Sequence, residues 1–135
     1  MGDYTTVRVT LNTRDETAFL KKLSIESDKR LLLDEQFLVE LTFHEWNRPE
    51  ATDFFVSNIV FLGTHDRGDE YGPYRFCSNG AKTADSPCDD AGRLVAPIDV
   101  SEGRLMMPEL EKIRAYFRFE DLCRRGLESQ IETVA

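Results

Sequence analysis

Four side chains of this sequence carry the nitrogen and sulfur atoms that a structural zinc ion prefers: His44, His65, Cys77 and Cys88. Each histidine stands where a predicted strand meets a connection, so adjacent strands could bring the two rings together. Zinc ligands usually come in close pairs, whereas 20 residues separate the histidines and 10 separate the cysteines. A zinc- or metal-dependent protein or enzyme is therefore one alternative, against surface histidines and ordinary thiols.

The chain has three cysteines, which cannot all pair with one another, and no Cys-x-x-Cys motif. Free thiols in a reducing compartment are the default prediction, and a bridge between Cys77 and Cys88 across a short loop is the alternative. Cys123 falls on the apolar side of a predicted helix, where cysteine usually acts as a small hydrophobic residue. A cysteine nucleophile activated by histidine is therefore not predicted.

Other catalytic patterns are missing from the sequence. It contains no Gly-x-Ser-x-Gly nucleophile elbow and no glycine-rich phosphate loop before a helix. The stretch from Asp66 to Glu70 bears carboxylates, but it lacks the alternating ligands of a calcium-binding EF-hand loop. We therefore predict a non-enzymatic protein that needs no cofactor.

Aromatic and acidic residues gather in two stretches that are candidates for binding a partner protein. Tyrosine and tryptophan dominate the energetics of many interfaces, and carboxylates around them steer a basic partner into register. The predicted partner-binding residues are Trp46, Asp66, Asp69, Glu70, Tyr71 and Tyr74. For Tyr71 and Tyr74 alike, a structural place in the core competes with this role.

The charge of the chain favours the same kind of partner. Its 135 residues include 17 Lys and Arg against 25 Asp and Glu, a net charge of −8. Because nucleic acids are usually bound by a clustered basic face, direct DNA or RNA binding is disfavoured. An acidic surface instead promotes fast, salt-sensitive encounter with a basic partner.

The length and composition predict one soluble domain spanning residues 1–135. Hydrophobic residues make up 41% of the chain, which is ordinary for a globular protein. No stretch is apolar enough to span a membrane, and the N-terminus lacks the features of a secretory signal. We therefore expect a cytoplasmic protein.

The first half of the chain predicts strands and one short helix. Alternation predicts a strand over 4–11, and a capping box formed by Thr13 and Glu16 predicts a helix that ends near Leu23. Residues 24–30 are polar and predict a turn. For residues 36–45 the alternation favours a strand, although a helical stripe competes.

The second half contains further strands, a long connection and a long helix. We predict a strand over 54–62 that ends at Gly63, with a helix starting near Asn47 as the alternative. Residues 63–93 read as an irregular acidic loop in which only 74–77 is strand-like. An edge strand over 94–100 and a helix over 107–131 complete the chain.

These elements predict an α+β fold: a mostly antiparallel sheet of about four or five strands, with a short N-terminal helix and a longer C-terminal helix packed on it. The leading functional hypothesis is an acidic inhibitor that occludes a basic site, often one for nucleic acid, on a partner protein. Toxin-immunity proteins and phage anti-defence proteins of the anti-CRISPR kind have this profile. A structural component that self-associates, as a homodimer through an exposed edge strand, is a further alternative.

Overall fold

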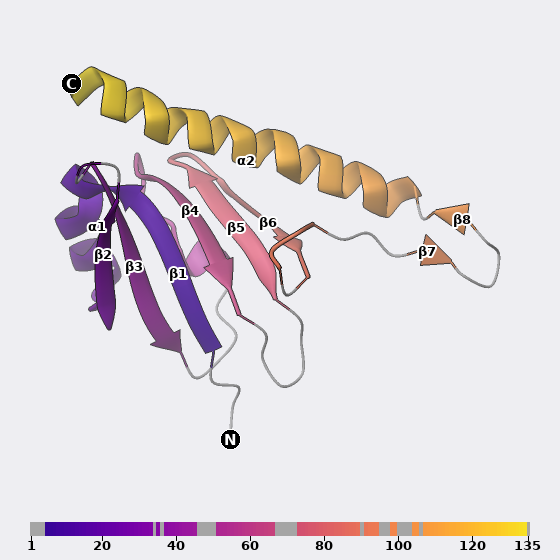
Figure 1. Cartoon of the computed structure of the whole chain (residues 1–135), viewed down its shortest axis with the longest axis horizontal. Helices are drawn as coiled ribbons and strands as arrows, with labels where there is room; N and C mark the ends of the chain where they lie inside the picture. The colour runs from indigo at the N-terminus through magenta and orange to yellow at the C-terminus, as the bar shows by residue number, and fades with distance from the viewer. Residues whose placement is uncertain are drawn as a thin grey trace.

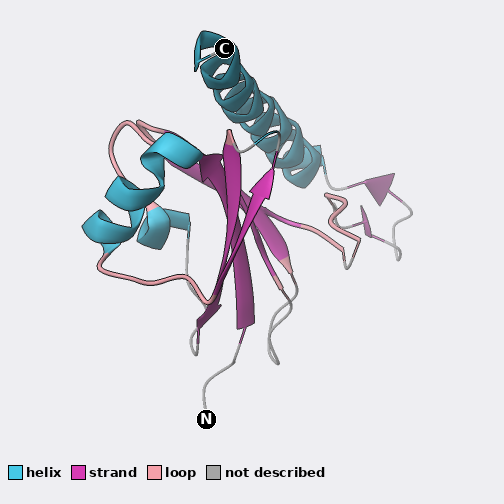
Figure 2. Ribbon diagram, turned by 60° about the vertical axis from the view of Figure 1, so that its left-hand side comes forward, coloured by secondary structure: helices cyan, strands magenta, loops and turns pink. Residues whose placement is uncertain are grey.

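The computed structural model describes residues 5–33, 35, 37–45, 51–66, 73–89, 91–94, 98–99, 104–105 and 107–134. Within these ranges the chain forms a six-stranded antiparallel sheet in the order β2-β3-β1-β4-β5-β6, with one helix on each face (Figures 1 and 2). A small two-stranded sheet, β7-β8, lies near the start of the second helix. The predicted α+β class is confirmed, with more strands than expected.

The elements run through the chain in simple order. Their bounds are β1 Thr5–Asn12, α1 Glu16–Leu23, β2 Lys29–Leu33, β3 Leu38–Glu45, β4 Val60–His65, β5 Tyr74–Asn79, β6 Thr83–Pro87, β7 Ile98–Asp99, β8 Arg104–Leu105 and α2 Met107–Val134. Two 3₁₀ turns, Thr13–Asp15 and Ala51–Phe54, precede α1 and β4. None of the described helices is both long and apolar enough to cross a bilayer.

One face of the sheet, here called the closed face, is covered by α1 and the Ala51–Phe54 turn. Alternate residues of β1 and β3 point to it, as the sequence pattern predicts. Its buried side chains are Val7, Val9, Leu11, Val39, Leu41, Phe43, Phe61 and Phe76, joined by Phe19 and Phe54. The ring of Phe61 meets those of Phe19 and Phe76 edge to face, so aromatic contacts fill this core.

Gly63 lies inside β4 because the closed face leaves no room for a side chain there. A β-carbon at this position would overlap the ring of Phe76, which faces Gly63 across the ladder. The glycine therefore marks a close approach within the strand, and the prediction that it ends the strand is wrong.

The opposite face, here called the open face, is covered only in part. Helix α2 packs over β4, β5 and β6, and its buried residues Tyr116 and Cys123 contact Cys77 of β5. The helix confirms the prediction over 107–131 and continues three residues further. Two ion pairs, each between residues one helical turn apart, lie along it, Glu120 with Arg124 and Asp121 with Arg125.

Other expectations are corrected in the first half of the chain. Residues 29–33 form β2, where a turn was expected over 24–30. Helix α1 begins at Glu16, after the 3₁₀ turn Thr13–Asp15, and the side chain of Asn12 caps this turn by accepting from the amide of Arg14 at 3.1 Å. The carboxylate of Glu16 accepts from Arg30. The strand predicted over 54–62 begins only at Val60, since Asn58 adopts a positive φ and turns the chain first.

The largest correction concerns the loop predicted over 63–93, which contains the end of β4 and the whole β5-β6 hairpin. The hairpin turns at Asn79-Gly80: Gly80 has a φ of 90°, and Asn79 Oδ1 accepts from the amides of Ala81 and Lys82. Of the strand predicted over 94–100, Leu94 makes an isolated bridge with Cys88, and β7 is two residues long. The helix considered near Asn47 lies outside the described residues.

Candidate functional site: an arginine trough on the open face

The strand registers place cations and hydroxyls in one row across the open face. Arg8 of β1 pairs with Thr64 of β4, and Thr64 pairs with Arg75 of β5. Directly opposed residues of antiparallel strands point to the same face, so the backbones of Arg8 and Arg75 stand roughly 10 Å apart, two strand spacings, with Thr64 between them. The full row reads Lys29, Thr42, Arg8, Thr64, Arg75 and Ser86.

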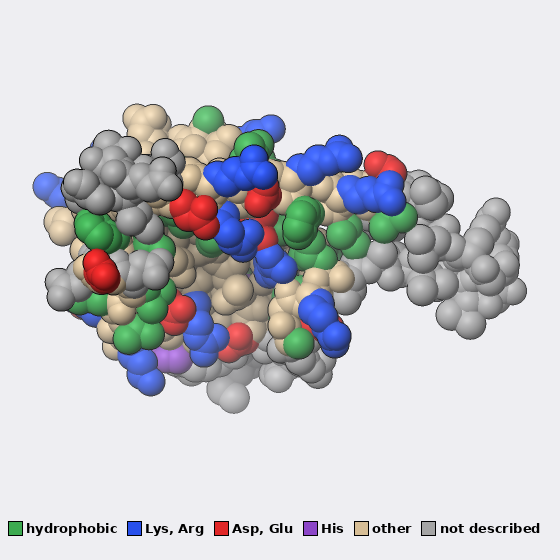
Figure 3. Space-filling model, turned by 45° about the horizontal axis from the view of Figure 1, so that its top comes forward, with side chains coloured by type: hydrophobic (Ala, Val, Ile, Leu, Met, Phe, Trp, Pro, Cys, Tyr) green, Lys and Arg blue, Asp and Glu red, His purple; other side chains and the backbone are tan. Residues whose placement is uncertain are grey.

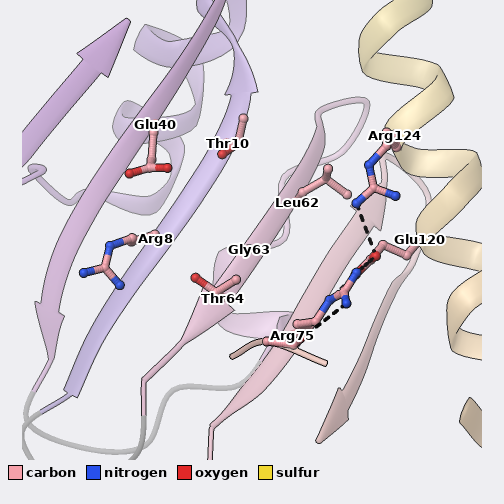
Figure 4. Close-up of a pocket in the computed structure, with 10 residues that line it drawn as sticks. Arg8, Thr10, Glu40, Leu62, Gly63, Thr64, Arg75, Glu120 and Arg124 are labelled. Atoms are coloured by element: carbon pink, nitrogen blue, oxygen red, sulfur yellow. Dashed lines mark hydrogen bonds and ion pairs between the residues drawn. The ribbon is translucent and has the colours of Figure 1, made fainter. Parts of the chain in front are cut away.

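Three residues of this row, Arg8, Thr64 and Arg75, line a cavity of about 280 Å³, which we call the arginine trough. Figure 4 shows Arg8 and Glu40 on one side, Thr64 in the middle, and Arg75 on the side of the helix. Its lining residues are Arg8, Thr10, Glu40, Leu62, Gly63, Thr64, Arg75, Gly92, Glu120 and Arg124. The trough thus combines three arginines and two threonine hydroxyls with two carboxylates.

A buried carboxylate holds the helix side of the trough in place. Glu120 is only 3% exposed and accepts from Arg75 Nε at 3.0 Å and from the hydroxyl of Tyr116 at 2.7 Å. A second oxygen of the same carboxylate meets Arg75 Nη2 and Arg124 Nη2. Because an unpaired buried carboxylate would be costly, this node ties α2 to β5 at one defined position.

Arg75 also reaches the loop before α2, where its Nη1 donates to the carbonyl oxygen of Gly92 at 3.0 Å. One guanidinium therefore joins a strand, a loop and a helix. Its planar set of donors suits this kind of multiple contact better than a lysine would.

Two thiols lie beneath the node, in contact with each other. The thiol of Cys77 donates to Cys123, and this hydrogen bond together with burial raises the pKa of Cys77 above its ordinary value. The same bond, with the nearby Arg124, lowers the pKa of Cys123. Burial also raises the pKa of Tyr116. Both sulfurs are buried, so these groups act in packing α2 on the sheet rather than on a solvent-borne substrate.

A second hollow adjoins the trough on the outer flank of α2. It measures about 560 Å³ and combines apolar side chains with four arginines: Arg75, Arg93, Leu94, Ile113, Arg114, Phe117 and Arg118. Arg93 and Arg114 bond to acids of their own neighbourhood, Asp89 and Glu111. Figure 3 shows Lys and Arg side chains along this stretch of α2, with hydrophobic side chains beside them.

The four predicted zinc ligands do not come together. His44 pairs with Thr6 and His65 with Val7, so the two histidines point to opposite faces of the sheet. Among the described residues, no group of three or more His, Cys, Asp and Glu is placed to hold a metal ion. The placement of these four residues therefore does not support the alternative of a metal site built from them.

Each of these residues has a local partner instead. The ring of His65 is buried and stacks on Tyr74 with centroids 4.4 Å apart. His44 is exposed and contacts the hydroxyl of Thr6 at 3.2 Å. The amide of Cys88 donates to the carbonyl of Pro73. The structure has no disulfide between Cys77 and Cys88.

The predicted partner-binding residues are only partly described. Asp66 is exposed and forms an ion pair with Arg8 at 3.2 Å. Tyr74 is 6% exposed and belongs to the closed-face core, so it is corrected from a surface contact to a packing residue. Trp46, Asp69, Glu70 and Tyr71 lie outside the described residues.

The sequence analysis missed the Glu120 node, although a signal was present. Tyr116, Glu120, Cys123 and Leu127 recur at helical spacing, and all four are buried. A carboxylate within an apolar helical stripe requires a buried partner. That requirement could have singled out Glu120 from the sequence.

Comparison of the chain with known protein families, curated proteins and solved structures finds no match.

Proposed function

We propose that the chain is a non-enzymatic binding protein that occupies a basic, nucleic-acid-binding surface of a partner protein, as toxin-immunity and phage anti-defence proteins do. Its carboxylates would stand in for the phosphates that the partner expects, and occlusion would be steric and electrostatic. The proposal includes a cytoplasmic location, where cysteine thiols stay reduced.

The observation that carries the proposal is the direction in which the central strands end. In the ladders, Thr5 lies opposite Glu45, and His65 lies opposite Tyr74. Strands β3 and β4 both run antiparallel to β1, so they end at the same end of the sheet, the lower end in Figure 1. In the sequence, Trp46 follows the last residue of β3 and Asp66 follows the last residue of β4, and these are the two stretches that we propose bind a partner.

The distribution of charge also supports an acidic contact outside the arginine trough. The described ranges contain 15 Lys and Arg against 18 Asp and Glu. The remaining sequence contains 2 against 7, so it carries more than half of the net charge of −8, and its acids include Glu50, Asp69 and Glu70. Of the predicted acidic contacts, Asp66 is described and exposed, and its pair with Arg8 is weak enough for a partner to displace.

The proposal is tested by recovering partners on the immobilised chain and titrating each purified partner at low and high salt. We expect the dissociation constant to rise steeply with salt. Replacement of Asp66, Asp69 and Glu70 by lysine should weaken binding by about 100-fold, since three attractive contacts become repulsive.

The matched control is the triple variant Asp85→Lys, Glu111→Lys and Glu128→Lys, which alters exposed acids elsewhere by the same total charge. It should bind the partner within about threefold of the unmodified chain. Binding that ignores salt, or that responds equally to both triple variants, would contradict occlusion by this end of the sheet.

The hollow beside α2 favours a second candidate function, recognition of an acidic, amphipathic segment of a partner. Phe117 is 57% exposed between Arg114 and Arg118. Exposed aromatic and arginine side chains around an apolar floor have the composition of interface hot spots, and their charge is complementary to Asp and Glu.

A labelled peptide of glutamates with interspersed leucines tests this candidate directly. It should bind the chain, and Arg118→Glu should weaken binding about tenfold, whereas Lys21→Glu on the far helix α1 should not. If the two variants weaken binding equally, the peptide responds to the overall charge of the chain and not to the hollow. Replacement of Asp66, Asp69 and Glu70 by lysine distinguishes this candidate from the first, because it should not weaken binding of the peptide.

A further inference from the structure

The two edges of the six-stranded sheet differ in how they are protected. Strand β6 carries Asp85 and Pro87, and α2 packs along it. Strand β2 has β3 as its one neighbour in the sheet, and the side chains of residues 29–32 are exposed. Leu31 is 58% exposed and Leu32 is 38% exposed. An edge strand with exposed leucines is a template for pairing with another strand.

The sequence of this edge is complementary to itself when it is reversed. Residues 29–35 read Lys-Arg-Leu-Leu-Leu-Asp-Glu, with two bases at one end, three leucines in the centre and two acids at the other. Antiparallel pairing of two copies about Leu32 sets Leu31 of one copy opposite Leu33 of the other. Strand β2 ends at Leu33, and Glu35 lies just beyond it with a φ of 55°. The same pairing brings Lys29 of one copy to this end of β2 of the other, close to Glu35, and both side chains are exposed.

We propose that two copies of the chain associate through β2 in antiparallel register about Leu32, and so extend the sheet across a two-fold axis. Backbone groups of the unpaired edge would supply the hydrogen bonds of the new ladder. Leucines would form its apolar centre, and a Lys29–Glu35 contact at each end would select this register, since a shift would set like charges together or leave them unmatched.

Burial of the edge leucines is tested by replacing one of them. Light scattering of the unmodified chain from micromolar to millimolar concentration should give a mass that rises from monomer to dimer. Leu31→Lys should raise the dimer dissociation constant at least about tenfold, because each copy loses one leucine and gains a buried charge. Leu122→Lys is the matched control: Leu122 is 60% exposed on α2, and its replacement should leave the dimer unchanged.

The register is tested by exchanging charges. Lys29→Glu alone and Glu35→Lys alone should each weaken the dimer by about three- to tenfold, since each creates two repulsive contacts. An equimolar mixture of the two variants should form a heterodimer as strong as the original, because every contact is again between opposite charges. Arg30 is left unchanged because it bonds to Glu16 at 2.7 and 2.9 Å.

A chain that stays monomeric over the whole concentration range would overturn the proposal. This holds even if a segment of another protein binds to β2, because the proposed partner is a second copy of the chain. A dimer that tolerates Leu31→Lys would overturn it as well, since another surface must then be responsible. Loss of the dimer in Leu31→Lys without recovery in the charge-exchange mixture would overturn the register. Protection of the β2 amides from hydrogen exchange that increases with concentration would support the proposal.

Discussion

The two faces of the sheet are stabilised by different means. The closed face buries a continuous set of aliphatic and aromatic side chains under α1 and the Ala51–Phe54 turn. The open face is covered over β4, β5 and β6 by one helix, which is fixed by the charged node of Arg75 and Glu120 beside a small apolar cluster. We infer that burial of apolar side chains on the closed face supplies most of the stability. On the open face, the charged node fixes the position of α2, and the uncovered strands leave polar surface for binding.

The largest expected effect comes from removing an aromatic ring of the closed face. Phe61→Ala should lower the free energy of unfolding by about 3–5 kcal/mol, because the ring is fully buried among Phe19 and Phe76. Phe117→Ala, the same change at an exposed site on α2, should cost less than about 1 kcal/mol. Urea unfolding measures both, and similar losses would abolish the contrast between the faces.

The charged node should give the next largest effect. Glu120→Gln removes the charge shared by Arg75 and Arg124 and should cost about 2–4 kcal/mol. The loss stays below that of a fully buried pair because Arg75 is 22% exposed and can recruit water. The control Asp121→Asn, which breaks the exposed pair with Arg125, should cost less than about 0.5 kcal/mol. If both variants unfold at the same urea concentration, the node does not anchor the helix.

Tyr116 should make the open face sensitive to alkali. Because burial raises the pKa of its phenol, the folded chain keeps it neutral while the unfolded chain ionises it near its ordinary pKa of 10.0. This contribution to stability is present in full below that pH and is lost as pH rises above it. Tyr116→Phe removes the hydrogen bond to Glu120 and should cost about 1 kcal/mol at neutral pH.

Thermal unfolding from neutral pH to about pH 11 measures this difference. The slope of stability against pH should be shallower in Tyr116→Phe than in the unmodified chain above pH 10, although Cys77 still contributes in both. Parallel slopes would show that Tyr116 ionises as easily in the folded chain as in the unfolded one.

The smallest effect is expected where the open face is uncovered. Arg8 and Asp66 form an ion pair with about half of each side chain exposed. Arg8→Met should therefore change the free energy of unfolding by less than about 0.5 kcal/mol. A larger loss in urea unfolding would mean that the trough side of β1 contributes to folding, and would narrow the contrast between the two faces.

Regular patterns in the sequence predicted the closed face and α2 well. Alternation in β1 and β3 follows directly from burial of one face, and the periodicity of α2 follows from packing of one side. The strand predicted from residue 54 was wrong up to residue 59, because Phe54, Val56 and Ile59 are buried without belonging to a strand. Their apolar run imitates a strand because burial, and not conformation, determines residue type there.

The hairpin of β5 and β6 was hidden for a different reason. Glycine and aspartate in residues 63–93 lowered the apparent strand content, although Asn79-Gly80 between two short runs is a strong hairpin signal. The arginine trough could not be predicted without this register. Arg8, Thr64 and Arg75 are far apart in sequence, and only the ladders of β1, β4 and β5 align them.

The ring of Phe76 occupies the space that a side chain at position 63 would fill, so these two sites cannot change independently. Replacement of Gly63 by alanine therefore requires a smaller residue at position 76, and phenylalanine at 76 requires glycine at 63. A combinatorial library randomised at both positions should return folded clones in which the two volumes trade against each other. The same inverse relation between the side-chain volumes at positions 63 and 76 would help to recognise related proteins whose remaining sequence differs.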